Sequence, residues 1–305
     1  MKIENLSIGI VCGGYSNERE ISLRGAQSIH QTLIAKNINS RLIDVKDKNK
    51  MHDKKMYEGI DFALVMIHGK GGEDGEVQEF LSSLNIKFSG SDILGLKNSY
   101  DKVLTKQIWS NNKINTPRYV SDIFDWSNLP DFLKKASKLV IKPSREGSSL
   151  GVSIIKNNSK NFLKAIKHAK KYEGSPIIEE FIPGRELTIA VLGDLICDPI
   201  EIEAQEDFYN FEAKYNRTDT SYSFPEFAED KLAKLKKLSK NAFDLLGCDK
   251  WGRVDLIEYE GKFFFIEVNT VPGMTETSLV PKSAEKEGLS FYKLIKKIIM
   301  DSIDN

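Results

Sequence analysis

The sequence predicts an α/β protein that opens with a doubly wound parallel sheet. Two short apolar runs, Leu6–Val11 and Ile60–Ile67, are typical of buried strands. Each run ends in a glycine-rich turn, and a helical pattern of apolar residues follows: Ile21, Ala26, Ile29 and Leu33 after the first, and Val77, Phe80, Leu81 and Leu84 after the second. Short strands that alternate with helices form parallel sheets, with ligand sites at the carboxyl ends of the strands.

Length and composition set further limits. The 305 residues exceed what one hydrophobic core usually organises, so two or three subdomains are expected. The chain is 40% hydrophobic and 29% charged, and its formal net charge of zero offers no basic field for nucleic acid. No apolar run approaches the roughly 18 residues of a transmembrane helix, and a signal-peptide core is absent. We therefore expect no membrane partner and a cytoplasmic location.

The three cysteines, Cys12, Cys197 and Cys248, are far apart in the sequence. Their odd number and wide spacing disfavour disulfides and a structural zinc site, and they agree with a reducing compartment. Each is expected to be a small core residue.

Polar side chains follow the first two predicted strands. Glu18 lies in the first turn, where Asn17 can cap the helix and Glu20 can complete a capping box. Glu18 can therefore belong to a ligand site, or it can simply complement the helix dipole. His68 lies at the end of the second strand, before flexible glycines, where a functional role and a structural one are both open.

A lysine and a Gly/Ser loop mark the next predicted site. The strand Leu139–Lys142 leads into a loop, residues 143–151, and the strand Val152–Ile155 follows it. Such a loop is typical of a phosphate-binding flap, in which backbone N–H and hydroxyl groups surround the oxygens and Lys142 adds charge. Ser148 can face a carboxylate or an amine. The residue order is not that of a Walker A loop, and an ordinary polar hairpin loop is the alternative.

Two further segments carry charges that suit a nucleotide. A helix around Tyr100–Trp109 bears Lys102 and Lys106. The strand Pro176–Ile182 ends in Pro183-Gly184, where backbone can read an adenine edge and a carboxylate can hold ribose hydroxyls. The carboxylates near this end are Glu179, Glu180 and Glu186.

The segment Phe208–Phe224 is aromatic and polar, without helical or strand periodicity. A loop of this length in a compact chain is typically a lid or a disordered segment. Its aromatic residues favour a lid, and Lys214 gives the tip of that lid a positive charge that can bind phosphate. Two amphipathic helices are expected after it, Asp230–Leu246 and a C-terminal helix over residues 291–299.

A β-hairpin is predicted between these two helices. Val254–Ile257 and Phe263–Val268 are apolar runs on either side of a Glu260-Gly261 turn signal. With a three-residue loop from Glu260 to Lys262, Tyr259 pairs with Phe263. The register of the whole hairpin follows from this pair.

Counting outward from the loop places four polar side chains on one face, with Asp255 opposite Glu267 and Arg253 opposite Asn269. Two carboxylates and an amide oxygen suit Mg²⁺, and the guanidinium suits an anion. The alternative is an exposed hairpin with a polar face. It is disfavoured because the opposite face is apolar throughout: Val254, Leu256, Phe264, Ile266 and Val268. A slip of one residue would separate the two carboxylates.

Taken together, the sequence blocks resemble those of the D-alanine–D-alanine ligase family of ATP-grasp enzymes. In chain order they are GGYSNEREISL, HGKGGEDG, SYDKVLTK, IKPSREGSSLG, FYNFEAKY, GRVDL and FIEVNTVPGMT followed by SLVP. The resemblance implies a three-subdomain ATP-grasp architecture with α+β character beyond the first domain. Its expected parts are an N-terminal α/β domain (1–95), a central subdomain (96–180) and a C-terminal subdomain (181–305) with a lid loop at 205–225.

The resemblance also implies a role for each motif. Residues that would serve the first D-alanine are Glu18 at its ammonium, Ser148 and Tyr215 linked to it by hydrogen bonds, and His68 near the carboxylate. Those for the second D-alanine are Ser278 and Leu279 at its carboxylate, with Arg253 on the tetrahedral oxyanion. Those for ATP are Lys102, Lys142 and Lys214 at the phosphates, and Phe208, Glu179, Glu180, Ile182 and Glu186 around adenine and ribose. Asp255, Glu267 and Asn269 would bind two Mg²⁺ or Mn²⁺ ions.

The implied activity is ATP-dependent ligation of two D-alanines through an acyl phosphate, for peptidoglycan precursor synthesis. A carboxylate is a poor acyl donor, so ATP phosphorylates it first, and the lid keeps water from the acyl phosphate. The stretch Glu212–Tyr215 matches the dipeptide-forming members and favours D-alanine over D-lactate as the second substrate. Thr277 departs from the family, which usually has histidine there.

Two other interpretations stay open at this point. One is another ATP-grasp ligase, such as one that joins D-alanine to D-lactate. The other is a nucleotide-binding regulator without catalysis. The resemblance further implies a homodimer.

Overall fold

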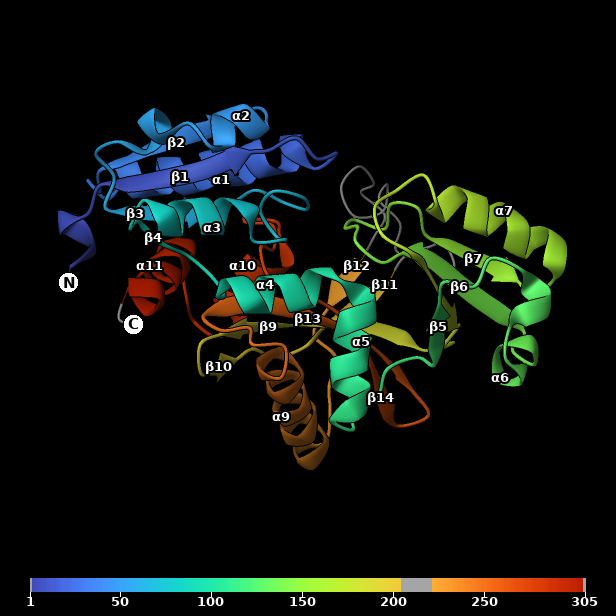
Figure 1. Cartoon of the computed structure of the whole chain (residues 1–305). Helices are drawn as coiled ribbons and strands as arrows, with labels where there is room; N and C mark the ends of the chain where they lie inside the picture. Colours follow the sequence, from blue (N-terminus) through green and yellow to red (C-terminus); the bar gives the residue numbers. More distant parts are fainter. Residues whose placement is uncertain (1, 204–220, 304–305) are drawn as a thin grey trace.

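The computed structural model describes residues 2–203 and 221–303, and it organises them around three β-sheets (Figure 1). Most of the predicted lid, including Phe208, Lys214 and Tyr215, lies outside the described residues. From chain length two or three subdomains were expected, and the described residues form three sheets. The boundaries at 95 and 180 stay a prediction.

The N-terminal sheet is parallel, with the strand order β2-β1-β3-β4. Its strands are β1 (Ile8–Gly13), β2 (Ser40–Val45), β3 (Phe62–Val65) and β4 (Lys87–Phe88). Its helices are α1 (Arg19–Ile34), α2 (Lys48–Met51) and α3 (Glu76–Ser83), with 3₁₀ turns η1 (Ile3–Asn5) and η2 (Lys54–Tyr57). Alternate residues of β1 enter two different cores, so helices cover both faces of the sheet. The predicted doubly wound sheet is confirmed.

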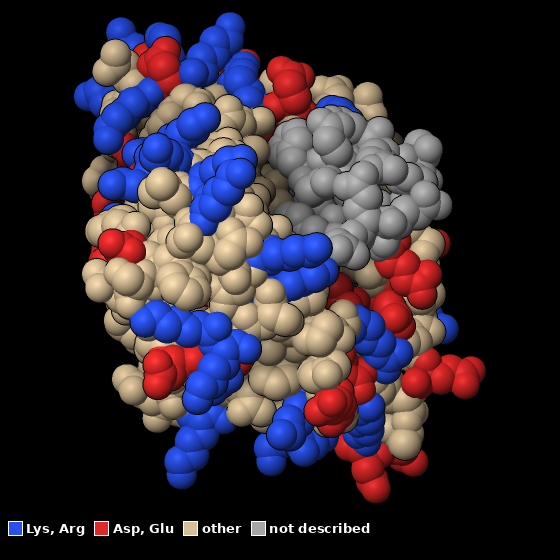
Figure 2. Space-filling view, turned by 90° about the vertical axis from the view of Figure 1, so that its right-hand side faces the viewer, with Lys and Arg blue, Asp and Glu red and all other residues tan. Residues whose placement is uncertain are grey.

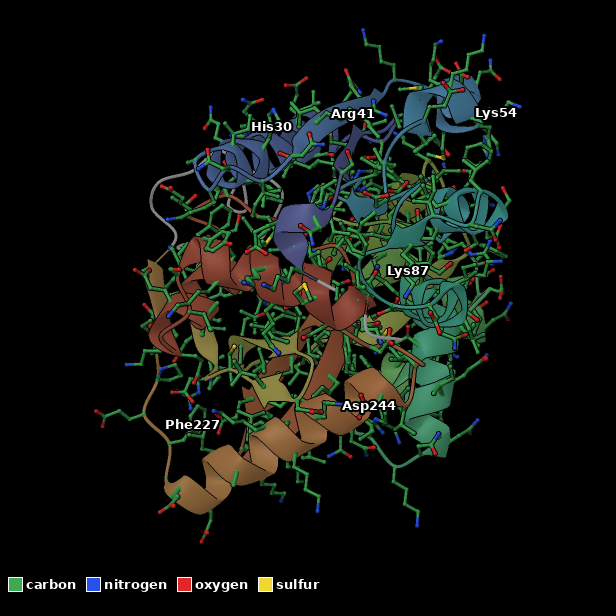
Figure 3. All side chains as sticks on the ribbon, turned by 90° about the vertical axis from the view of Figure 1, so that its left-hand side faces the viewer. His30, Arg41, Lys54, Lys87, Phe227 and Asp244 are labelled. Carbon is green, nitrogen blue, oxygen red and sulfur yellow. The ribbon has the colours of Figure 1, made fainter. Side chains whose placement is uncertain are left out.

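The C-terminal helix α11 (Phe291–Ile303) returns to this first domain. Its apolar residues Leu294, Ile295, Ile298 and Ile299 belong to the same core as α1 and one face of the sheet. Figure 3 shows α11 below α1, and Lys87 of β4 donates a hydrogen bond to the carbonyl of Ile303 at 2.5 Å. The two ends of the chain therefore stabilise one domain.

The second sheet is antiparallel, with the order β5-β8-β6-β7. Its strands are β5 (Tyr119–Ser121), β6 (Lys138–Pro143), β7 (Ser153–Lys156) and β8 (Pro176–Glu180), and its helices are α6 (Asp131–Lys134) and α7 (Ser159–Ala169), with the 3₁₀ turn η3 (Trp126–Asn128). Figure 2 views the molecule from the side of α7, where basic side chains are spread over the surface with uncharged areas between them. Helix α7 was not expected from the sequence.

The third sheet, also antiparallel, has the path β12-β11-β9-β13-β14, with β10 beside β9. Its strands are β9 (Arg185–Leu192), β10 (Leu195–Ile196), β11 (Ile200–Glu203), β12 (Ser221–Ser223), β13 (Trp251–Tyr259) and β14 (Lys262–Asn269); α9 (Glu229–Asp244) and α10 (Leu279–Lys286) accompany it. Within residues 2–203 and 221–303, no helix has the length and apolar character needed to cross a membrane.

The predicted loop of the β13–β14 hairpin is wrong, but the predicted pairing of its polar residues is confirmed. Tyr259 pairs with Lys262 across a two-residue Glu260-Gly261 turn, in which both residues have positive φ (48° and 73°) as a type I′ turn requires. A β-bulge next to Leu256 then shifts the register by one residue. Asp255 therefore still pairs with Glu267, and Arg253 with Asn269.

The bulge also changes which aromatic residues are buried. Phe263 and Phe265 enter the core beneath the hairpin, whereas Phe264 and Ile266, expected on the buried face, are only half-buried. In a regular ladder the side chains would alternate between the two faces all the way to the turn. The extra residue reverses this alternation in the part of the hairpin between Glu267 and the turn.

Two expectations about helix starts are also wrong. Helix α1 begins at Arg19 with Glu18 as its N-cap, and no side chain caps it, so Asn17 and Glu20 form no capping box. The predicted helix around Tyr100 is divided into α4 (Ile93–Tyr100) and α5 (Lys102–Asn111). Asp101 separates them because its carboxylate accepts hydrogen bonds from the N–H groups of Val103 and Leu104.

Candidate active site

Two adjoining cavities lie where the three sheets meet. The first, here the polar chamber, has a volume of about 170 Å³ and is lined by residues including Glu18, Arg24, Ser148, Arg253 and Ser278. The second, here the apolar chamber, has a volume of about 160 Å³ and is lined by residues including Val140, Lys142, Ile154, Glu180 and Ile266. Both are lined by Lys102, Glu146, Gly147 and Glu267. A ligand in one chamber therefore meets a ligand in the other at these residues.

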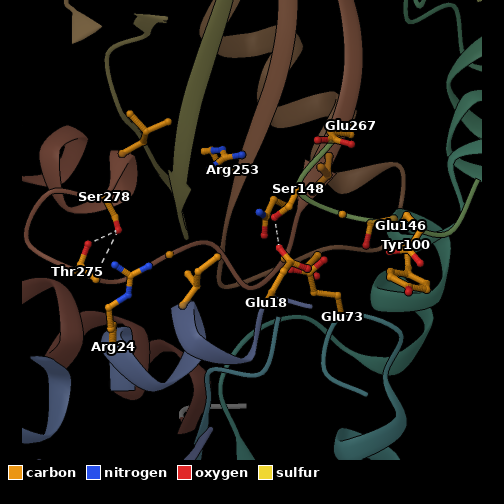
Figure 4. Close-up of a pocket in the computed structure, with 18 of the residues that line it drawn as sticks. Glu18, Arg24, Glu73, Tyr100, Glu146, Ser148, Arg253, Glu267, Thr275 and Ser278 are labelled. Atoms are coloured by element: carbon orange, nitrogen blue, oxygen red, sulfur yellow. Dashed lines mark hydrogen bonds between the residues drawn. The ribbon is translucent and has the colours of Figure 1, made fainter. Parts of the chain in front are cut away.

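A hydrogen bond between Ser148 and Glu18 closes one side of the polar chamber (Figure 4). Ser148 lies in the loop between β6 and β7, 130 residues from Glu18, and its hydroxyl donates to the Glu18 carboxylate. Both residues are buried. The backbone of Ser148 and Ser149 is left-handed, with φ of 47° and 61°, which is strained for serine. The loop is thus held in one conformation against the first domain.

The backbone at Gly69 can lie close to the Glu18 carboxylate because glycine has no Cβ. A Cβ at Gly69, whose φ is +65°, would lie 2.7 Å from Glu18 Oε2. This close packing holds the carboxylate at the edge of the first sheet, where the predicted anion- or amine-binding corner lies.

His68 lies behind the wall of the polar chamber. It is buried, and its Nδ1 is 3.9 Å from Oε1 of Glu73, which does line the chamber. Burial lowers the pKa of His68, but Glu73 and Glu18 raise it more, so the net change is upward.

Three lysines approach the junction and the apolar chamber. Nζ of Lys102 donates to the carbonyl of Glu146 at 2.6 Å and lies 3.2 Å from Glu267. Nζ of Lys142 lies 3.0 Å from Glu179, and Nζ of Lys106 lies 3.1 Å from the same carboxylate oxygen. The buried Glu179 therefore holds two ammonium groups together.

The pKa values of this cluster follow from burial and charge. Burial lowers the pKa of Lys106 to about 8, although Glu179 opposes the change. Burial raises the pKa of Glu179, but Lys106 and Lys142 lower it more, so the carboxylate stays ionised.

The polar face of the β13–β14 hairpin forms the floor between the chambers. Arg253 donates two hydrogen bonds to Asp255, from Nε at 2.9 Å and from Nη2 at 2.7 Å, and Thr188 donates a third at 2.6 Å. Oδ1 of Asn269 accepts from the N–H of Val271 at 3.1 Å. Glu267 lies beside Lys102 at the junction.

This donor set fits a hard divalent cation. Asp255, Glu267 and Asn269 present two carboxylates and an amide oxygen from paired positions on two strands. Among residues 2–203 and 221–303, no group of three or more His, Cys, Asp and Glu side chains is placed to hold a metal ion.

Four of the five residues expected around adenine and ribose line the apolar chamber: Glu179, Glu180, Ile182 and Glu186. The fifth, Phe208, lies outside the described residues. Glu180 is bound by Arg118, with Nη2 and Oε2 separated by 2.7 Å. Burial raises the pKa of Glu180, but Arg118 lowers it more. Opposite them the walls are apolar, which suits a flat ring.

Ser278 and Leu279 lie at the start of α10, at the far end of the polar chamber. The Ser278 hydroxyl does not cap the helix, and instead accepts a hydrogen bond from the N–H of Thr275 at 3.0 Å. The first N–H groups of a helix have no partner within it and attract anions.

Several lining residues were not assigned from the sequence. Glu73 and Thr275 line the polar chamber and lie within the blocks HGKGGEDG and FIEVNTVPGMT, but neither residue was assigned a role of its own from the sequence. Tyr100 was read only as the start of a helix, yet it lines the polar chamber, and burial raises the pKa of its hydroxyl. Their proximity arises from packing between distant segments. The DG and PG sequences beside Glu73 and Thr275 could have indicated loops, but no more.

Comparison with known proteins decides the family. A family model described as "D-ala D-ala ligase C-terminus" matches residues 100–300. A D-alanine–D-alanine ligase from Pseudomonas entomophila is 37% identical over 298 residues, covering 97% of this chain and 93% of the relative. The chain belongs to the D-alanine–D-alanine ligase family.

Other D-alanine–D-alanine ligases agree in sequence and structure. The one from Pseudoalteromonas translucida is 36% identical over 299 residues and 97% of each chain. A crystal structure of the Bacillus anthracis ligase matches with a TM-score of 0.86 at 32% identity, covering 97% of each chain, and a structure of that ligase with ATP matches with a TM-score of 0.84 at 29% identity, covering 98% of each chain. The predicted resemblance and the ATP-grasp fold class are confirmed.

Proposed function

We propose that the two chambers together carry out the ATP-dependent ligation of two D-alanines, with the amino acids in the polar chamber and ATP in the apolar one. The products are D-alanyl-D-alanine, ADP and phosphate, and the reaction supplies a peptidoglycan precursor. The observation that carries this arrangement is the junction at Lys102, Glu146, Gly147 and Glu267. It is where a substrate carboxylate and the phosphates of ATP can meet.

In this proposal the first D-alanine binds beside Glu18. The carboxylate of Glu18 holds its ammonium, and the Ser148 hydroxyl keeps Glu18 in place while it draws the flap over the chamber. His68 lies behind Glu73, and we propose that it supports the substrate's carboxylate on that side. Tyr215, outside the described residues, is proposed to join the same hydrogen-bonded link from the lid.

ATP is proposed to bind with its phosphates toward the junction. Lys102 and Lys142 attract the phosphate oxygens, and Lys214 would join them from the lid. The adenine and ribose would lie among Glu179, Glu180, Ile182 and Glu186, with Phe208 over them. Because Glu179 holds Lys142 at 3.0 Å, it also supports that lysine in its phosphate role.

Asp255, Glu267 and Asn269 would hold Mg²⁺ or Mn²⁺, and we propose two ions. Bound ions would neutralise phosphate charge during phosphoryl transfer. Asp255 would then share its oxygens between the ions and Arg253, which donates two hydrogen bonds to it in this structure. The guanidinium of Arg253 would then face the oxyanion that develops in the polar chamber.

The reaction proceeds in two steps. The carboxylate of the first D-alanine takes the γ-phosphoryl group of ATP, giving an acyl phosphate and ADP. The amine of the second D-alanine, whose carboxylate is held by Ser278 and Leu279, then attacks the acyl carbon, and phosphate leaves. Closure of the flap by Ser148 and of the lid keeps water from hydrolysing the acyl phosphate.

We also propose a cytoplasmic homodimer. Four large apolar side chains are exposed on helices of the described structure: Ile34 on α1, Leu94 on α4, Leu104 on α5 and Leu163 on α7. Of these helices, α1 belongs to the first domain and could pack against a second copy. Sedimentation equilibrium of the purified protein tests this proposal. We expect twice the chain mass of 34.5 kDa, and the single mass would refute it.

Phosphate release from Mg-ATP tests the reaction. D-alanine alone, L-alanine alone, and D-alanine with D-lactate are compared, and the products are identified by mass. We expect one phosphate for each D-alanyl-D-alanine formed, and no ester with D-lactate. Phosphate release without dipeptide, or no release from any substrate, would contradict the proposal.

A further inference from the structure

Three basic side chains line the polar chamber: Arg24, Lys102 and Arg253. Two of them are already engaged at the metal and phosphate end, Lys102 beside Glu267 and Arg253 on Asp255. Arg24 forms no side-chain hydrogen bond or ion pair with any residue in 2–203 or 221–303. Within those ranges, Arg24 lines the chamber without a charged partner.

Arg24 lies at the end of the chamber where α10 begins. It projects from α1, and Figure 4 shows its guanidinium directed toward the hydroxyls of Thr275 and Ser278. The two hydroxyls bond to one another at 2.8 Å. The guanidinium, the hydroxyl pair and the N-terminus of α10 thus converge on one small region.

The charge of this region is positive. The amides of Leu279 and Val280 open α10, an eight-residue helix, and carry the positive end of its dipole. The acidic residues of the chamber wall lie away from it: Figure 4 shows Glu73, Glu146 and Glu267 on the other side of the view from Arg24, with Glu18 between. Thr277 carries no charge, and Glu276 beside it is exposed and does not line the chamber.

We propose that Arg24 binds the carboxylate of the second D-alanine and so selects an acceptor that carries one. The inference rests on the proposed placement of that carboxylate at Ser278 and Leu279. A planar guanidinium can donate two parallel hydrogen bonds to a carboxylate, which sets direction as well as affinity. Because the start of α10 and Glu18 line the same chamber, a molecule whose carboxylate is held there can present its amine to the acyl group of the first D-alanine.

Arg24→Met tests this role, with Arg24→Lys as the conservative variant and Gln27→Met as the matched control. Gln27 is exposed on the same helix and does not line the chamber. Initial rates over a wide range of D-alanine concentration, fitted with a two-site rate law, give separate KM values for donor and acceptor. Loss of a charge-assisted pair at a partly open site predicts an acceptor KM raised about tenfold in Arg24→Met. The acceptor KM of Arg24→Lys should lie between those of the wild type and Arg24→Met. The donor and ATP KM values should stay unchanged.

A second readout isolates the carboxylate. D-Alaninamide, which lacks the negative charge, is offered as acceptor in competition with D-alanine, and the dipeptide and its amide are resolved by mass. The wild-type preference for the acid should shrink in Arg24→Met by about the same factor as the rise in acceptor KM. An unchanged acceptor KM, a rise confined to the donor, or equal losses with acid and amide would overturn the inference. Absence of dipeptide from the wild type would instead refute the proposed function.

Discussion

The two chambers differ in how their residues are held. In the polar chamber, charged groups from distant segments face one another across loops, as Glu18 and Ser148 do over 130 residues of sequence. In the apolar chamber, apolar side chains of two antiparallel sheets form the walls, and the charged groups at their edge are buried in a cluster around Glu179. Contacts between distant segments of the chain therefore form the polar chamber. Side chains on the strands of two sheets form the apolar chamber.

This difference predicts that the apolar chamber contributes mainly to ATP binding and the polar chamber to the chemical steps. A wall of strand residues offers a nucleotide the same surface throughout the reaction, which contributes binding in ground and transition states alike. Groups such as Arg253, which line the polar chamber, can act on charge that develops only during the reaction. Substitutions in the polar chamber should therefore change kcat or amino-acid KM, and those in the apolar chamber should change ATP KM.

Arg253→Ala should have the largest effect on activity, and it is the strictest test of this division between the two chambers. Removing the donor that faces the oxyanion should lower kcat about 10³-fold while ATP affinity changes little. Steady-state kinetics and equilibrium ATP binding measure the two quantities. Arg253→Lys keeps the charge without the planar fork and should recover only part of the rate. Equal, modest losses of kcat and ATP affinity would count against the oxyanion role.

Glu267→Gln should affect both chambers, because this residue lines their junction. Loss of a metal-binding carboxylate should lower the rate up to about 100-fold and raise the Mg²⁺ concentration needed for half-maximal activity. A Mg²⁺ titration of phosphate release measures this shift. Glu260→Gln, at the exposed turn of the same hairpin, is the control. A rate loss without any change in the Mg²⁺ requirement would argue against metal binding by Glu267.

Lys106→Met should raise ATP KM about tenfold with little effect on kcat, because Glu179 then holds Lys142 alone and one positive charge is lost. The pKa of Lys106 is about 8, so in the wild type the ammonium loses its proton as pH rises through 8. ATP KM should therefore rise above pH 8 in the wild type and stay level there in Lys106→Met.

The exposed neighbour Gln107→Met serves as the control for Lys106→Met, with ATP KM measured from pH 6.5 to about 9.5, on either side of the lowered lysine pKa. The same pH dependence in the variant and the wild type would show that Lys106 is not the titrating group.

Ser148→Ala should have the smallest effect. Loss of one hydrogen bond to a charged partner should raise the donor KM about three- to fivefold, and leave ATP KM nearly unchanged. Ser148→Gly is the matched variant, since it also removes the hydroxyl but relieves the left-handed backbone at φ 47°. If Ser148→Gly retains wild-type KM values, the backbone conformation and not the hydrogen bond positions the flap.

The sequence by itself determined the order of motifs, and with it the family, the fold class and the general location of the site. These follow from local chemistry: glycine turns after apolar strands, a lysine before a Gly/Ser loop, and alternation on a hairpin. The pairing of Asp255 with Glu267 was predicted with the wrong loop. It holds because the bulge beside Leu256 compensates for the shorter turn, and no local pattern indicates a bulge.

Tertiary structure alone decided which charged groups face one another. Glu179 appears in the sequence as one of two adjacent glutamates, but β8 buries it against Lys106 and Lys142 while Glu180 turns to Arg118. Arg24 looks like any surface residue of an amphipathic helix until α10 is packed against the same cavity. Such contacts depend on segments brought together from far apart, where burial and charge are set by the whole fold and not by neighbours in the chain.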